Sequence, residues 1–130
     1  MAYKLLVVDD DKDIVEVMNK KLLQEGYDVI TAFDGEEAII KVRDEDPDII
    51  LLDLIMPKKN GFEVLEEVRR DYNDRWRPII IISAKTELAS FRKGYELEAD
   101  HYLTKSCDIG HVLQGIKTMI SLIPHRIKKK

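Results

Sequence analysis

The sequence predicts an α/β protein with a parallel sheet of five strands flanked by five helices. Short apolar runs alternate along the chain with segments of helical period. Runs such as residues 79–82 have no polar face, as in central parallel strands that helices cover on both sides. With 130 residues, 45% hydrophobic and 35% charged, the chain has the composition of one globular domain. We expect this domain to span residues 1–124, followed by a basic C-terminal tail at residues 125–130.

Five apolar runs are the expected strands of this sheet. Pro47 and Pro78 lie at the starts of the third and fourth runs, where a missing amide proton costs little. The strands are expected at residues 4–9, 27–32, 47–53, 78–83 and 100–105.

Segments between and after the strands carry apolar stripes that predict amphipathic helices. Asp34 with Glu37, and Asn60 with Glu63, have the N-cap residue and third-position acid that satisfy free amides at a helix start. The clearest stripes are Ile14, Val15, Met18 and Leu22; Phe62, Leu65, Val68 and Tyr72; and Ile109, Val112, Leu113, Ile116, Ile120 and Ile123.

Composition excludes several classes of function. A formal charge of -4 argues against a surface that coats nucleic acid. No apolar stretch approaches the length needed to span a membrane, so we expect no membrane insertion. Cys107 is the single cysteine, which rules out an internal disulfide or a cysteine-based metal cluster and favours a reducing compartment. We therefore expect a cytoplasmic protein.

Acidic residues follow two of the expected strands. Asp9 and Asp10 end the first strand and Asp53 ends the third, at the edge where open parallel sheets bind ligands. If these strands are neighbours, about 4.8 Å apart, the three carboxylates share one pocket. Like charges about 4 Å apart repel by about 4 kcal/mol at an effective dielectric near 20, so such a site should raise a pKa or bind a metal. All-oxygen ligands favour Mg²⁺.

A helix cap is the alternative interpretation of this acidic run. Asp11 and Asp13 fit a cap and a first helical turn better than a ligand set. Asp9 and Asp10, taken alone, are equally compatible with either role.

Two more strand ends favour a functional site. Ser83 ends the fourth strand and Lys105 ends the fifth. Alone, Ser83 would be a cap and Lys105 a solvated lysine. Together with the carboxylates they form a polar, charge-complementary group at four strand ends.

The motifs "VVDDD", "PDIILLDLIMPKKNGFEVL", "IIISAK" and "HYLTK" stand in this order, and with them the chain resembles the response-regulator receiver domains from residue 4 to about residue 123. The resemblance implies a doubly wound sheet with strand order 2-1-3-4-5. It also implies that Asp53 is a phosphoacceptor, with Asp9 and Asp10 as the acidic pair and Ser83 and Lys105 as the hydroxyl and lysine of the site.

The implied reaction belongs to two-component or phosphorelay signalling. Asp9, Asp10, Asp53 and the backbone carbonyl of Ile55 hold Mg²⁺, and Asp53 attacks the phosphohistidine of a histidine kinase or phosphotransfer protein. Lys105 contacts a phosphoryl oxygen, and Ser83 donates to another after transfer. Such a protein is a signalling phosphoacceptor and catalyses only its own phosphorylation and dephosphorylation.

Tyr102 matches the switch position of the family. An inward movement of the Ser83 hydroxyl would leave space for its ring, and the fourth helix, fifth strand and fifth helix, with Phe91, Tyr95 and Tyr102, would form the output surface for a downstream protein. The alternative is a half-buried tyrosine that only packs against the fourth helix.

Some positions depart from the family pattern or vary within it. The bond after Lys105 leads to Ser106 instead of proline, and a cis bond there would cost about 2.5 to 4 kcal/mol, so we expect trans. Glu98 replaces a glycine at a helix exit, where a left-handed backbone would be mildly strained. Ile55 and Lys85 are expected to tune the lifetime of the phosphoryl group, the alternatives being simple loop packing and a solvent-facing lysine.

Three other functions are possible for a protein with these motifs. An aspartate-nucleophile, Mg²⁺-dependent phosphatase would need a second acid two residues after Asp53, where Ile55 stands. A flavin-binding electron carrier would need a phosphate-cradling loop in place of the aspartates. A receiver-like module that binds partners without phosphorylation is the third possibility.

Overall fold

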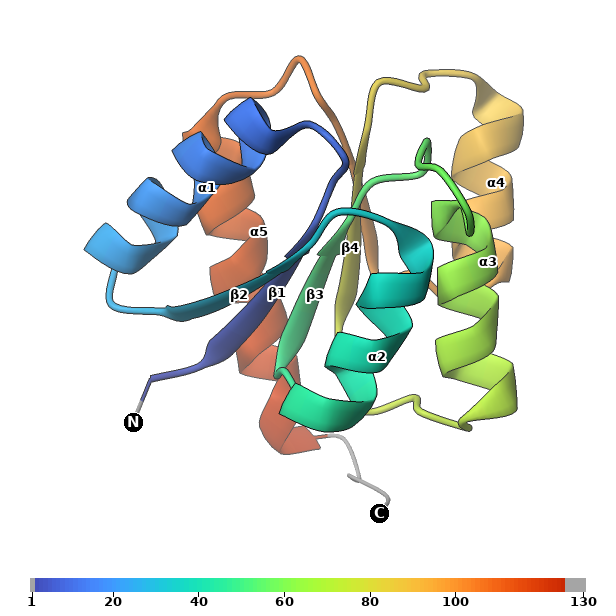
Figure 1. Ribbon diagram of the computed structural model, residues 1–130, viewed down its shortest axis with the longest axis horizontal. Helices are drawn as coiled ribbons and strands as arrows, with labels where there is room; N and C mark the ends of the chain where they lie inside the picture. The colour runs from blue at the N-terminus through green and yellow to red at the C-terminus, as the bar shows by residue number, and fades with distance from the viewer. Residues whose placement is uncertain (1, 126–130) are drawn as a thin grey trace.

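The computed structural model describes residues 2–125 and contains one five-stranded parallel sheet between two layers of helices (Figure 1). The strand order is β2-β1-β3-β4-β5, which confirms the predicted doubly wound topology. The strands are β1 (Lys4–Val8), β2 (Asp28–Ala32), β3 (Ile49–Leu52), β4 (Ile79–Ser83) and β5 (His101–Thr104). Residues 126–130 of the expected tail lie outside the described residues, so the domain boundary stays a prediction.

The helices cover both faces of the sheet. They are α1 (Lys12–Gln24), α2 (Gly35–Glu45), α3 (Gly61–Glu66), α4 (Leu88–Glu96) and α5 (Ile109–Leu122). A π-helical segment, Glu67–Asp71, continues α3, and a short 3₁₀ turn, Ile123–His125, follows α5. None of the helices within residues 2–125 is both long and apolar enough to cross a membrane.

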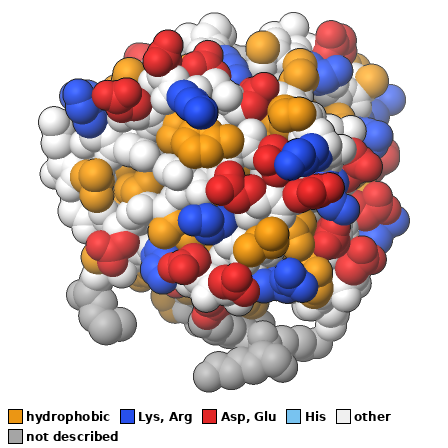
Figure 2. Space-filling view, viewed as in Figure 1, with side chains coloured by type: hydrophobic (Ala, Val, Ile, Leu, Met, Phe, Trp, Pro, Cys, Tyr) orange, Lys and Arg blue, Asp and Glu red, His pale blue; other side chains and the backbone are white. Residues whose placement is uncertain are grey.

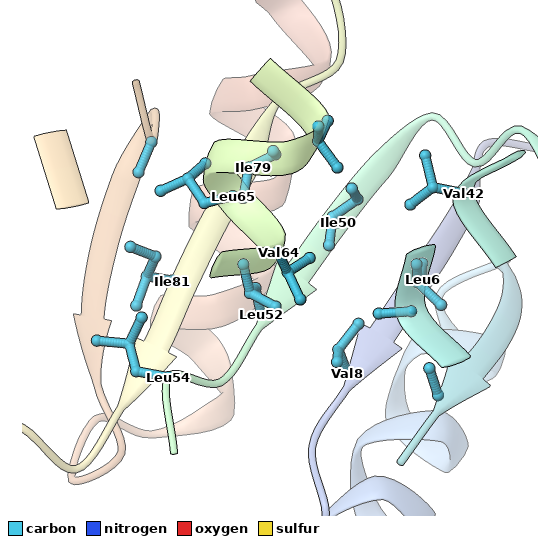
Figure 3. Packing of buried hydrophobic residues seen from close by; sticks show 14 of the residues in the cluster. Leu6, Val8, Val42, Ile50, Leu52, Leu54, Val64, Leu65, Ile79 and Ile81 are labelled. Atoms are coloured by element: carbon cyan, nitrogen blue, oxygen red, sulfur yellow. The ribbon is translucent and has the colours of Figure 1, made fainter. Parts of the chain in front are cut away.

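Two apolar cores lie on opposite faces of the sheet because successive strand residues point in opposite directions. Leu6 and Ile50 pack with residues of α2 and α3 in one core (Figure 3). Leu5 and Ile49 pack with residues of α1 and α5 in the other. Both faces of the central strands are therefore buried, as their apolar composition predicts.

Local side-chain caps start the helices where the sequence predicts them. Asn60 and Glu63 form a reciprocal capping box at α3. Asp34 Oδ1 accepts a hydrogen bond from the Glu37 N–H (2.8 Å), but Glu37 Oε1 accepts from the N–H of Phe33 (2.7 Å), one residue before the cap. The α2 pair thus also fixes the chain that leads into the helix.

The predicted apolar stripe of the third helix is wrong at its last residue. Tyr72 is 43% exposed, and its hydroxyl bonds to the Glu67 carboxylate. The cause is the π-helical segment, in which the Tyr72 N–H bonds to the Glu67 carbonyl five residues back. The extra residue in this turn rotates Tyr72 away from the core, and the same segment carries a buried Arg69.

Arg69 ties three segments together at the end of the sheet opposite the acidic residues. Its Nε donates to the Glu98 carbonyl (3.0 Å), Nη1 to the Asp74 carbonyl (2.8 Å) and Nη2 to Asp100 Oδ2 (2.9 Å). Glu98 has a φ of 72°, the left-handed backbone expected where the family favours glycine. The Arg69 hydrogen bond holds this carbonyl in place.

Arg77 is a second buried arginine that joins separate segments at this end of the sheet. It binds the carboxylates of Asp46 and Asp74, and its guanidinium lies 4.6 Å from the centre of the Trp76 ring. Trp76 is buried in the segment before β4.

The face shown in Figure 2 has acidic and basic side chains interspersed. On the described part of this face there is no continuous basic surface of the kind that binds nucleic acid.

We predict that Arg69→Ala lowers the free energy of unfolding by about 3–5 kcal/mol, because it removes the buried guanidinium that pairs with Asp100 and donates to two carbonyls. Arg70→Ala is the matched control, since Arg70 makes an exposed ion pair with Glu66 worth about 1 kcal/mol or less. Urea unfolding of both variants measures the difference. Equal losses would show that the Arg69 contacts contribute no more than a surface pair.

Candidate functional site

The pairing of β1 with β3 brings the acidic residues together. Val8 and Leu52 are register partners, and the next residues along the two strands are Asp9 and Asp53. The Asp53 N–H continues the ladder to the Val8 carbonyl (2.9 Å). One carboxylate oxygen from each of Asp9, Asp10 and Asp53 lies within 4.8 Å of the others. Asp9 and Asp53 are buried and Asp10 is exposed, so the cluster opens to solvent.

Lys105 joins this cluster from the end of β5. Its N–H bonds to the Ser83 carbonyl (2.8 Å), which extends the pairing of β4 with β5. Its Nζ lies 3.0 Å from Asp9 Oδ2 and 3.4 Å from Asp53 Oδ2. Peptide bonds among the described residues are all trans, so the predicted trans bond between Lys105 and Ser106 is confirmed.

The electrostatics of the cluster are unbalanced. Burial, and then the charge of Asp9, raise the pKa of the Asp53 carboxyl, while Lys105 lowers it in part. Burial lowers the pKa of the Lys105 ammonium, but its contacts with Asp9 and Asp53 outweigh this effect and the pKa is raised. Three carboxylates and one ammonium leave two negative charges without a partner in this group. This charge and an all-oxygen donor set fit a hard divalent cation.

The loop after β3 folds back on the site. Asp53 Oδ1 accepts from the Leu54 N–H (2.9 Å), and the Gly61 N–H bonds to the Leu54 carbonyl (2.9 Å). A Cβ at Gly61 would lie 2.2 Å from the Asp53 carbonyl oxygen, so only glycine allows α3 to start this close to the strand end. Sequence reasoning did not identify Gly61. The Ile55 side chain, two residues after Asp53, is 56% exposed.

Ser83 lies deeper than the charged residues. Its side chain is fully buried at the end of β4, and its hydroxyl accepts a hydrogen bond from the Lys85 N–H (3.2 Å). It therefore stands outside the ion-pair contacts that join Lys105 to Asp9 and Asp53.

Tyr102 points inward from β5. Its hydroxyl donates to the Lys85 carbonyl (2.9 Å), and its ring centre lies 4.3 Å from that of Phe91. Burial raises the pKa of the Tyr102 hydroxyl, and a hydrogen-bonding contribution from the Ser83 side chain lowers it in part. With 9% of its surface exposed, Tyr102 does not form part of the outer surface, whereas Tyr95 on α4 is exposed.

A hollow of about 400 Å³ adjoins the acidic cluster between the sheet, α1 and α5. Its walls are largely apolar, and its charged end includes Asp9, Asp53 and Lys105. The apolar wall residues include Ile14, Val17, Met18, Ile82, Ile109 and Val112. This hollow could not be predicted from the sequence, because its walls belong to segments far apart in the chain.

Comparisons with known proteins agree with this geometry. A family model described as "Response regulator receiver domain" matches residues 5–117. A CheY-like receiver domain protein from Methanospirillum hungatei is 25% identical, with 96% of this chain and 98% of that chain covered and a TM-score of 0.89. The chemotaxis protein CheY4 of Vibrio cholerae is 29% identical, with 92% and 99% covered and a TM-score of 0.85. The receiver domain of the Francisella response regulator 1452 is 32% identical, with 90% and 95% covered and a TM-score of 0.84.

We predict that Asp53→Asn stabilises the protein at neutral pH in the presence of a chelator. The raised pKa means that the folded state disfavours the ionised carboxyl, so a neutral amide removes this cost. The gain should shrink as the pH falls through the raised pKa, where wild type takes up a proton, and disappear below the ordinary value of 3.8.

Urea unfolding across this pH range checks the prediction. Asp13→Asn, at an exposed position in the first turn of α1, is the control and should show no such gain. An Asp53→Asn variant less stable than wild type at neutral pH would contradict the assigned electrostatics.

Proposed function

The chain belongs to the response regulator receiver domain family, and we propose that Asp53 accepts a phosphoryl group from the phosphohistidine of a histidine kinase or phosphotransfer protein. The observation that carries the proposal is the placement of Asp53. Its buried carboxylate lies 3.4 Å from the Lys105 ammonium and within 4.8 Å of the oxygens of Asp9 and Asp10. A nucleophilic carboxylate beside one cation and a site for another is what phosphoryl transfer requires.

The donor set of the site suits Mg²⁺. Asp9, Asp10 and Asp53 would hold the ion with their carboxylates, and Ile55 with its backbone carbonyl. The two uncompensated negative charges support a divalent ion, and the exposed Asp10 supports one that keeps part of its water shell. When bound, Mg²⁺ supplies positive charge that offsets the charge of the incoming phosphoryl group.

In the proposed reaction an Asp53 carboxylate oxygen attacks phosphorus as the bond from phosphorus to the donor imidazole nitrogen breaks. The products are an aspartyl phosphate and a free histidine on the donor. Lys105 already contacts Asp53 Oδ2, so its ammonium is within reach of a phosphoryl oxygen carried by that side chain. Ser83, one strand away, would donate its hydroxyl to another phosphoryl oxygen.

The proposed response passes from Ser83 to Tyr102. The hydroxyl of Ser83 and the carbonyl of Lys85 both belong to the segment that Tyr102 contacts, so a movement of Ser83 changes the surroundings of the tyrosine hydroxyl. The downstream protein would bind α4, β5 and α5, where Phe91 is half-buried and Tyr95 is exposed. We assign the chain a signalling role without an activity on other substrates.

We place this reaction in the cytoplasm. The unpaired Cys107 is compatible with a reducing compartment.

Phosphorylation by a small phosphodonor with Mg²⁺ tests the nucleophile. We expect wild type and Asp13→Asn to be labelled and Asp53→Asn to remain unlabelled, because Asp53→Asn removes the proposed nucleophile whereas Asp13 is exposed in the first turn of α1. Intact-protein mass spectrometry measures the added phosphoryl group. Equal labelling of Asp53→Asn and wild type would overturn the assignment.

The metal assignment has its own test. Asp10→Asn removes one charged ligand and should weaken Mg²⁺ binding by about 10-fold or more, a loss on the scale of one strong charged contact. Asp28→Asn, an exposed site at the start of β2, is the control. A calorimetric titration with undiminished affinity in Asp10→Asn would move the ion elsewhere.

Ile55 is proposed to lengthen the lifetime of the phosphoryl group, because an exposed apolar side chain two residues after Asp53 cannot orient an attacking water. Lys85 would assist by covering the approach with its apolar stem. Ile55→Asn should shorten the lifetime of phosphorylated Asp53 severalfold at saturating Mg²⁺ and leave Mg²⁺ affinity unchanged. Decay of the label after donor removal is the measurement, and a decay as slow as that of wild type would refute the tuning role.

A further inference from the structure

Helix α4 packs unusually close to the sheet at Gly94. Gly94 is buried, and a Cβ built there would lie 2.9 Å from Ile81 Cδ1 and 3.4 Å from Tyr102 Cδ2. The first distance is shorter than a carbon contact allows, and the neighbour that would have to move is fully buried in the core. A side chain at this turn would require either Ile81 Cδ1 or the helix to shift.

The ring of Tyr102 occupies the space beside this glycine. Phe91 covers it with a ring tilted by 59°, and the Lys85 carbonyl accepts its hydroxyl hydrogen bond. We call the space bounded by Ile81, Lys85, Phe91 and Gly94 the Tyr102 slot. Two of its walls, Phe91 and Gly94, belong to α4, so the width of the slot depends on how closely this helix approaches β4 and β5.

We propose that Gly94 is a positioning residue that holds the Tyr102 slot open, so that the tyrosine ring can lie inside it and α4 can lie flat against the sheet. This inference rests on the proposed function in one respect, namely that Tyr102 is the switch residue. The substrate-side residues are not involved, because Gly94 contacts Ile81 and Tyr102 and none of the carboxylates.

A methyl group at position 94 has two ways to relieve its contacts. The clashing atom, Cδ1, is the end of the Ile81 side chain, but Ile81 is fully buried in the core, so a shift of this group moves it against other packed side chains. The outer face of α4 is exposed at Leu88 and Tyr95, so an outward shift of the helix meets little resistance. Such a shift withdraws Phe91 from the Tyr102 ring and releases the tyrosine from the Lys85 carbonyl.

The test compares Gly94→Ala with Gly115→Ala by NMR of the tyrosine rings, with Tyr102→Phe to assign the signal. Both changes place alanine in a helix, but a Cβ at Gly115 would have its nearest neighbour, His101 Cδ2, at 3.4 Å. We expect Gly94→Ala to lose the shift that the Phe91 ring imposes on Tyr102, and the pKa of Tyr102 to fall toward 10.0. Gly115→Ala should retain both. An unchanged Tyr102 signal in Gly94→Ala would overturn the proposal.

A double variant separates a narrowed slot from general damage. Ile81→Val removes Cδ1, the atom closest to the added methyl group, so Gly94→Ala combined with Ile81→Val should restore the Tyr102 signal. If Gly94→Ala does not fold, recovery of folding in the double variant supports the proposal and failure to recover overturns it.

Labelling with a small phosphodonor and Mg²⁺ distinguishes this inference from the proposed function. Wild type and Gly94→Ala should be labelled equally at Asp53. A wild type that takes no label would refute the phosphoacceptor role, while the ring measurement would still decide whether Gly94 holds the slot.

Discussion

The parallel pairing of β1 with β3 places the carboxylates of Asp9 and Asp53 in one buried pocket, where they repel each other. The other residues of the site act on this repulsion. Neither residue can turn away, because each follows directly on a strand whose backbone hydrogen bonds continue past it. Lys105 reaches both carboxylates but cannot neutralise the cluster. The folded state therefore carries an electrostatic cost that the two apolar cores must offset, and a divalent ion or a proton relieves it.

The two ends of the sheet differ in how their buried charges are balanced. At the carboxyl end the carboxylates exceed their cationic partners, and Asp10 is left open to solvent. At the other end, buried Arg69 and Arg77 are surrounded by acceptors, so their charge is satisfied within the protein. The first arrangement favours binding and the second favours stability. The left-handed Glu98 lies at the second end, where an arginine holds its carbonyl.

Much of this architecture could be predicted because it depends on local chemistry. Apolar runs and turn residues located the strands, and cap residues such as Asn60 located helix starts. The convergence of Asp9 with Asp53 followed once the strand order was assumed. Features set by distant contacts could not be predicted in this way. The π-helical turn moved Tyr72 off the core, Arg69 proved to be buried, and the close approach at Gly94 depends on Ile81 and Tyr102.

The stacking of Arg77 on Trp76 gives the protein an intrinsic optical reporter. Trp76 is the single tryptophan of the chain, it is 5% exposed, and a guanidinium lies 4.6 Å from its ring. Its emission should therefore be blue-shifted in the folded protein and move to the red when the segment before β4 opens to water. Trp76 lies at the opposite end of β4 from the acidic cluster. Its emission should therefore report the loss of the buried Arg69 and Arg77 contacts and not small changes around Asp53. Fluorescence and tyrosine NMR thus observe opposite ends of the same sheet.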